Sequence, residues 1–207
     1  ELVVQVESDT GRRAVAIGAD VAIEEEAIAL FDATVAELGS LDCLVNNAGI
    51  GPGYGPFVDL TVADIEATWA TNLTGAFVCA REAVRRMATS RGGHGGSIVN
   101  VSSRAAVIGS PNEWIHYAAS KAGLDTLTTG LSKEVAHEGI RVNTVRPGLM
   151  STDFGPWAPD GRNERLRPGI PMGRAGEPHE MASAIVWLAS DAASYVTGAF
   201  IDVGGGR

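Results

Sequence analysis

The stretch that decides the fold is "LDCLVNNAG" (Leu41–Gly49), a short apolar run that leads into a polar turn with a glycine. Such a run predicts a buried β-strand that ends in a turn. Apolar residues recur at helical spacing over 24–38, just before it, and Gly39 ends that pattern. The segment therefore predicts a helix followed by a strand.

The same alternation continues in both directions along the chain. Further short apolar runs predict strands over 13–21, 97–103, 140–148 and 198–206. Between them, Thr61 and Asp64 resemble a capping box for a long helix, and further helical patterns cover 115–135 and 178–190. Apolar strands that alternate with helices predict an α/β fold with a doubly wound, mostly parallel sheet covered by helices on both faces. We expect one such domain over residues 1–207.

One long segment, residues 149–176, interrupts this alternation. It contains four prolines and no continuous period, so we expect a loop or lid with short helical pieces. Loops of this length in compact domains are usually functional. The segment is therefore a candidate cover for a substrate pocket.

Polar motifs follow four of the predicted strands. In parallel sheets ligands bind beyond the carboxyl ends of the strands, where such motifs meet. Small residues there let a flat ligand approach the backbone, although a tight turn would explain them equally well. The motifs are Asp20-Val21, Asn46–Gly49, Ser102-Ser103 and Pro147-Gly148.

Tyr117 and Lys121 lie four residues apart on a predicted helix, so their side chains share one face. A nearby ammonium lowers the pKa of a phenol toward neutrality, which suits a general acid or base. The same spacing also occurs by chance on many helices. The pair alone does not decide between a reactive dyad and two ordinary residues on one face of a helix.

Two further polar residues have a similar double interpretation. Ser103 ends a strand fourteen positions before Tyr117, where it could bind a substrate oxygen or stabilise a turn. Asn72 interrupts an apolar helical stripe, and a buried amide must find hydrogen-bond partners. It could hold a water or simply cap a neighbouring backbone.

Composition excludes several classes of function. The 16 basic and 25 acidic side chains give a net charge of -9, which argues against nucleic acid or a membrane as the main partner. Cys43 and Cys79 sit in apolar runs and are expected to be small core residues in a reducing, cytoplasmic compartment. The four histidines lack metal-ligand spacing and no G-x-S-x-G motif is present, so we expect neither a metal site nor a serine hydrolase.

Eight motifs follow one another in order and cover essentially the whole chain. Together they resemble the short-chain dehydrogenase/reductase family. They are "ADV" (19–21), "LVNNAG" (44–49), "TNLTGAF" (71–77), "GSIVNVSS" (96–103), "YAASKAG" (117–123), "IRVNTVRPG" (140–148), "IPMGRAGEP" (170–178) and "SDAASYVTGAFIDVGGG" (190–206).

The resemblance implies a Rossmann-type fold, NAD or NADP as cofactor, and interconversion of an alcohol and a ketone. Tyr117 would be the acid/base, Lys121 would hold the nicotinamide ribose and lower the Tyr117 pKa, Ser103 would polarise the substrate oxygen, and Asn72 would anchor a water in the proton relay. The cofactor cleft would be lined by Asp20, Val21, Asn46, Ala48, Gly49, Pro147, Gly148 and Thr152. The substrate pocket would draw on Asn112, Glu113, Trp114, His116 and the 149–176 segment. By analogy we expect a homo-oligomer, most often a tetramer.

The front of the chain departs from the family pattern. The family opens with a strand and a T-G-x-x-x-G-x-G turn that binds the pyrophosphate at a helix N-terminus, and no such turn occurs here. We therefore expect that a first strand–helix–strand unit is absent from this sequence and that the natural protein is longer. The choice between NAD and NADP, which depends on that region, cannot be read.

Two rival functions stay open. A dinucleotide-binding regulatory protein would share the fold but would not need an acid/base. A nucleotide-sugar epimerase would use the same Tyr/Lys chemistry but would need a substantial extra C-terminal region.

Overall fold

The central strand of the fold, β2 (Gly96–Val101), is buried along almost its whole length, as expected for a continuous apolar run. In the computed structural model, which describes residues 1–152 and 159–207, it lies between β1 (Cys43–Asn46) and β3 (Ile140–Pro147). β4 (Phe200–Val203) pairs with the far side of β3. All three pairings are parallel and the strand order is β1-β2-β3-β4. The predicted α/β class is confirmed.

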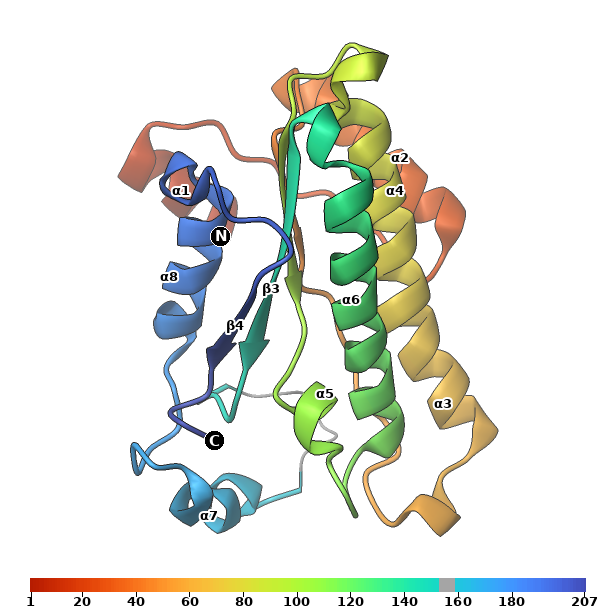
Figure 1. Ribbon diagram of the computed structural model, residues 1–207, viewed down its shortest axis with the longest axis vertical. Coiled ribbons are helices and arrows are strands. Elements are labelled where there is room, and N and C mark those ends of the chain that lie inside the picture. The colour runs from red at the N-terminus through yellow and green to blue at the C-terminus, as the bar shows by residue number, and fades with distance from the viewer. Residues whose placement is uncertain (153–158) are drawn as a thin grey trace.

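Helices cover both faces of this sheet. α2 (Glu24–Leu38) and α4 (Ala76–Met87) pack with Ile98 of β2 in one apolar core, and α6 (Ile115–Glu134) lies on the same side (Figure 1). α8 (Pro178–Ala189) packs with Val99 in a second core on the opposite face. Because successive strand residues point to opposite faces, Ile98 and Val99 divide between the two cores. α1 (Leu2–Thr10) contributes no buried residue.

The long helix predicted after Thr61 is present in three parts. The Thr61–Asp64 capping box is confirmed at the start of α3 (Val62–Trp69). A π-helical segment, η2 (Ala70–Gly75), follows and runs into α4. Such π segments are rare and are frequent at functional sites. Here the segment contains Asn72, the polar residue that interrupted the apolar stripe.

The strand predicted over 13–21 is wrong. Residues 11–20 carry no regular structure and are mostly exposed, with Val15 38% exposed. An apolar run becomes a strand only where a neighbour offers a hydrogen-bonding edge, and no described strand pairs with this one. Instead, Arg13 binds the end of α2 through Glu37.

Cys43 is exposed, whereas Cys79 is buried as predicted. The expectation for Cys43 fails because β1 is the edge of the described sheet, so nothing described covers that side of the strand.

The 149–176 segment is irregular over its described part, as predicted. It contains the short helix α7 (Arg162–Leu166) and the 3-10 helix η6 (Arg167–Gly169). An isolated β-bridge joins Met150 to Gly176. Residues 153–158, including Pro156, lie outside the described residues. The remaining short elements are η1 (Phe57–Asp59), η3 (Thr89–Arg91), α5 (Ala105–Ile108), η4 (Ala136–Glu138) and η7 (Asp191–Ala193).

The described residues contain neither a membrane-spanning helix nor a metal-ligand cluster. No helix there has the length and apolar character needed to cross a membrane. In the same part of the chain, no group of three His, Cys, Asp or Glu side chains is placed to hold a metal ion.

Gly75, the last residue of the π segment, packs directly against the backbone before α2. A Cβ at Gly75 would lie 2.6 Å from the carbonyl oxygen of Val21. Gly75→Ala should therefore lower the free energy of unfolding by about 1–3 kcal/mol, because backbone cannot move aside as a side chain can. Urea unfolding followed by circular dichroism measures the change.

Gly130 provides the matched control for this substitution. It is also helical, and a Cβ there would meet nothing within 4 Å. Gly130→Ala should raise stability by about 0.4–1 kcal/mol through loss of chain entropy in the unfolded state. Equal stability of the two variants would contradict the packing argument.

Candidate active site

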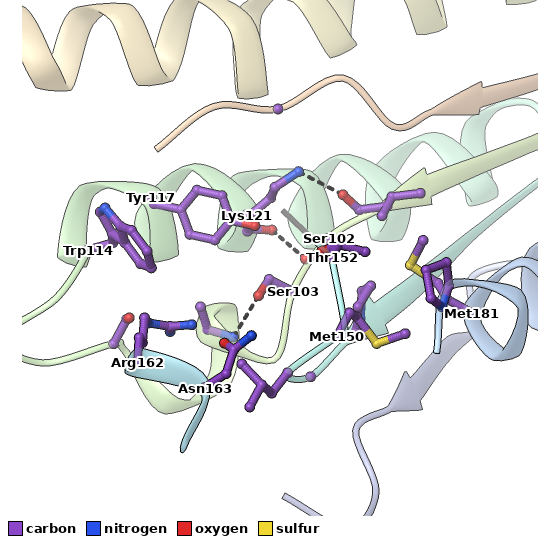
Figure 2. Close-up of a pocket in the computed structure, with 18 of the residues that line it drawn as sticks. Ser102, Ser103, Trp114, Tyr117, Lys121, Met150, Thr152, Arg162, Asn163 and Met181 are labelled. Atoms are coloured by element: carbon purple, nitrogen blue, oxygen red, sulfur yellow. Dashed lines mark hydrogen bonds between the residues drawn. The ribbon is translucent and has the colours of Figure 1, made fainter. Parts of the chain in front are cut away.

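A cavity of about 1000 Å³ opens at the carboxyl ends of β1, β2 and β3. α6 brings Tyr117 and Lys121 to its wall, and the segment after β2 brings Ser103 (Figure 2). The turns after β1 and β3 contribute Gly49 and Gly148. The structure thus brings together residues that lie up to 99 positions apart in the sequence, as the parallel-sheet argument predicted.

Tyr117 and Ser103 both line the cavity, and their hydroxyls are close enough for Ser103 to act on the Tyr117 pKa. Burial raises the pKa of Tyr117 to about 12, and the Ser103 hydrogen bond and the Arg162 charge offset only part of that rise. The charge that lowers this pKa here is that of Arg162, and desolvation of the phenolate outweighs it. Tyr117 is therefore protonated at neutral pH. The effect of Lys121 on the Tyr117 pKa stays a prediction.

Lys121 is buried, and its ammonium Nζ donates a hydrogen bond to the Val101 carbonyl at 2.8 Å (Figure 2). The same ammonium lies 5.7 Å from the centre of the Tyr117 ring. Burial lowers the pKa of Lys121 to about 8, although Asp125, one turn along α6, acts to raise it. A charged Lys121 is thus costly for the fold, and its proton is held only weakly.

Asn72 connects the loop after β1 to α6. Its Oδ1 accepts from the Ile50 N–H at 2.8 Å, and its Nδ2 donates to the Ile50 carbonyl at 2.9 Å. Nδ2 also donates to Ser120 Oγ at 3.2 Å. Protein groups therefore take both amide donors, and only Oδ1 keeps a lone pair for a water. The structural and functional interpretations of Asn72 are compatible with each other.

The residues predicted to line a cofactor cleft divide into two groups. Ala48, Gly49, Pro147, Gly148 and Thr152 line the main cavity together with Tyr117 and Lys121. An adjoining apolar groove of about 270 Å³ shares Ala48 with the cavity and adds Val21 and Asn46.

Asn46 and Asp20 do not point toward a cofactor cleft as expected. The Asn46 side-chain amide turns into the core, where it donates to Asn100 Oδ1 at 2.9 Å and to the Ala76 carbonyl. Asp20 lines neither space: its Oδ1 accepts from the Ala22 N–H at 2.9 Å and stabilises the turn before α2.

The predicted substrate residues are only partly correct. Trp114 lines the cavity, but Asn112, Glu113 and His116 do not. His116 is buried, with Nε2 2.8 Å from the Pro52 carbonyl oxygen. Asn112 has a positive φ of 58° and is exposed. A helix-start loop can be placed from sequence, but the direction of each of its side chains cannot.

Several lining residues were not singled out from the sequence. Arg162 and Asn163 fall within the predicted 149–176 cover but carry no pattern of their own. Ser110 is buried at the cavity with a φ of 48°, and the Gly and Pro on either side of it are a turn signal that could have indicated a loop there. Ala105 and Met181 are further examples.

The cavity residues fit a nicotinamide dinucleotide. A Cβ at Gly49 would lie 3.4 Å from Lys121 Nζ and 3.5 Å from Asn72 Oδ1, so a side chain would fill space that glycine leaves open beside the ammonium. Small residues permit a flat ring to approach the backbone. Lys121 could donate to ribose hydroxyls in that space.

A parallel α/β sheet with a Ser, Tyr and Lys cavity at its carboxyl edge defines the class of dinucleotide-dependent oxidoreductases. The family model described as Enoyl-(Acyl carrier protein) reductase matches residues 1–207. The chain is 50% identical over 201 residues to the uncharacterized oxidoreductase YgfF of Escherichia coli K12, covering 97% of this chain and 81% of that one. It is 41% identical to an L-rhamnose 1-dehydrogenase (NAD(P)(+)) of Azotobacter vinelandii, covering 95% and 76%.

A solved structure supports the same class of protein. A short-chain type dehydrogenase/reductase from Mycobacterium marinum superimposes with a TM-score of 0.91 at 33% identity, covering 99% of this chain and 79% of that one. The chain belongs to the short-chain dehydrogenase/reductase family. It is an oxidoreductase of a family that uses NAD(P), with a small molecule as substrate.

Proposed function

We propose that this protein interconverts an alcohol and a ketone with NAD or NADP, using Tyr117 as the acid/base. The observation that carries the proposal is the meeting of Ser103, Tyr117 and Lys121 in one cavity beside the small turn residues of β1 and β3. A binding protein without turnover has no need of a phenol, a serine hydroxyl and an ammonium that meet in one cavity.

Each of these side chains has a defined task in this mechanism. When bound, the nicotinamide supplies the hydride chemistry, and the protein supplies position and proton transfer. Ser103 Oγ and Tyr117 Oη donate to the substrate carbonyl oxygen, which orients and polarises it. Tyr117 then gives its proton to the oxygen as negative charge develops there. In the reverse direction the same hydroxyl takes the proton from the alcohol.

Lys121 and Asn72 support that proton transfer. Lys121 would turn from the Val101 carbonyl toward the ribose hydroxyls, where its charge favours the Tyr117 phenolate. Asn72 holds the Ile50 loop beside Lys121, and its remaining lone pair can accept from a water of the proton relay. Because burial raises the Tyr117 pKa to about 12, Tyr117 carries its proton at neutral pH and is available as the acid when a ketone is reduced.

For the substrate we propose a small polar alcohol. Polar side chains of Ser110, Asn163 and Glu164 line the cavity together with the apolar Met150 and Met181. The A. vinelandii relative is named for a sugar, which agrees with hydroxyl groups reaching these side chains.

We also propose a homo-oligomer, with a tetramer as the first candidate. Val186 and Trp187 of α8 are 66% and 42% exposed, and Tyr195 is fully exposed nearby in sequence, which leaves an apolar surface for a second copy. That the chain forms one Rossmann-type domain over 1–207 stays a prediction.

An activity screen tests the function directly. The purified protein is mixed with NADH or NADPH and a set of ketones and aldehydes, and with NAD or NADP and a set of sugars and cyclic alcohols, while absorbance at the nicotinamide band is followed. We expect turnover of at least one polar substrate. Tight dinucleotide binding without turnover of any substrate would contradict the proposal and favour the regulatory alternative.

A further inference from the structure

Glu113, two residues before α6, binds two arginines of α7. Its Oε2 accepts from Arg162 at 2.7 and 3.2 Å, and its Oε1 accepts from Arg165 at 2.9 Å. The Glu113 side chain is only 13% exposed and that of Arg162 18%, so this contact is more than a surface ion pair. Both carboxylate oxygens are committed to α7.

Aromatic rings extend the contact. The Arg162 guanidinium lies 4.7 Å from the centre of the Trp114 ring, and Tyr54 packs edge-on against the same ring at 5.0 Å. Arg165 also donates to the Tyr54 hydroxyl at 2.7 Å. α7 is therefore held to two separate segments, the loop after β1 and the start of α6.

Backbone hydrogen bonds hold Glu113 in place. Its carbonyl accepts from the Gly55 N–H at 3.0 Å, and its N–H donates to the Ser110 carbonyl at 3.3 Å. Ser110 and Asn112 on either side of Pro111 both have positive φ, a conformation that costs free energy outside glycine. A strained loop thus holds one carboxylate in place to receive α7.

The position of α7 decides the shape of the cavity. Arg162 and Asn163 of this helix lie across the cavity from Trp114 and Tyr117 (Figure 2), and Glu164 also lines the cavity. The centres of the Trp114 and Tyr117 rings are 6.4 Å apart. Any shift of α7 relative to Trp114 changes the space directly beside the Tyr117 hydroxyl.

We propose that Glu113 is a positioning residue that fixes α7 against the Trp114 wall and so sets how tightly the enzyme holds its substrate. The inference rests on the proposed function for the identity of the pocket, but not for the contact itself. Glu113 does not line the cavity, so its effect passes through Arg162 and Arg165.

Steady-state kinetics on the purified protein test the effect on substrate. Glu113→Gln keeps the shape of the side chain and removes its charge, and it should raise KM about tenfold while kcat changes less than about threefold. Glu113→Asp should recover part of the loss. Arg165→Gln, which alters no cavity-lining residue, should raise KM in the same direction, and the double variant should be no worse than Glu113→Gln alone.

The control is Glu134→Gln, an exposed glutamate at the other end of α6. Wild-type KM in Glu113→Gln, or additive effects in the double variant, would overturn the inference. So would a loss in kcat at constant KM, because Glu113 would then act in the chemical step.

Hydrogen exchange provides a readout that needs no activity. Amides of residues 162–166 should exchange faster in Glu113→Gln than in the wild type, while the amides of β2 stay unchanged. If the wild type shows no turnover but α7 loosens in the variant, the proposed function fails and the positioning role stands. Unchanged exchange in α7 would overturn the positioning role whatever the activity.

Discussion

Tyr117→Phe is expected to lower kcat by about a thousandfold, because the substitution removes the proton that the mechanism transfers and little else. The phenyl ring keeps its place beside Trp114, so the cavity retains its shape. Ser103 loses the neighbouring Tyr117 hydroxyl but can still donate to the substrate oxygen. Dinucleotide affinity, measured by fluorescence titration, should stay within about threefold of the wild type, because binding of the cofactor does not require the proton-transfer step.

The chain offers a clean control for this change. Tyr195 is fully exposed and lies outside the cavity, so Tyr195→Phe should leave both kcat and dinucleotide affinity unaltered. Retention of at least a third of wild-type kcat in Tyr117→Phe, on every substrate the wild type accepts, would refute the acid/base role.

Much of the fold could be predicted from the sequence because its signals are local. The apolar run of β2 and the capping box of Thr61 and Asp64 each determine structure through neighbouring residues. The strand and the helix start predicted from them are both confirmed. The run over 13–21 has the same local character, yet it forms no strand. Strand formation depends on a partner elsewhere in the sheet, which a local pattern does not contain.

For the candidate site, too, some properties could be predicted from the sequence and others could not. Ser103, Tyr117 and Lys121 could be placed in one cavity because parallel strands bring their carboxyl ends to one edge. The effect of that cavity on acidity could not be predicted. Helical spacing showed that Lys121 lies near Tyr117. The burial that raises the Tyr117 pKa to about 12 also depends on α7, which comes from a distant part of the chain. The pairing of Glu113 with Arg162, 49 residues away, has no signature in either segment.

Lys121→Met is expected to inactivate the enzyme and at the same time stabilise the fold. Burial lowers the Lys121 pKa from 10.5 to about 8, so the charged form costs the native state about 3 kcal/mol at neutral pH. Methionine fills a similar volume without a charge. The Val101 carbonyl loses its hydrogen bond from Nζ, at a cost of about 1–2 kcal/mol, so a net gain of about 1–2 kcal/mol remains at pH 7.

The pH dependence separates this cause from improved packing. Between pH 8 and 10.5 the unfolded chain binds a proton that native Lys121 has released, so this group makes the wild type more stable as pH rises through that window. Lys121→Met lacks the effect, and its advantage should shrink from pH 7 to pH 10. Urea unfolding at the two pH values measures it. Lys133, the other lysine of the chain, is exposed on α6, so Lys133→Met should follow the wild type. A stability difference independent of pH would show that Lys121 carries no buried charge, and the argument that its ammonium supports the Tyr117 phenolate would fail with it.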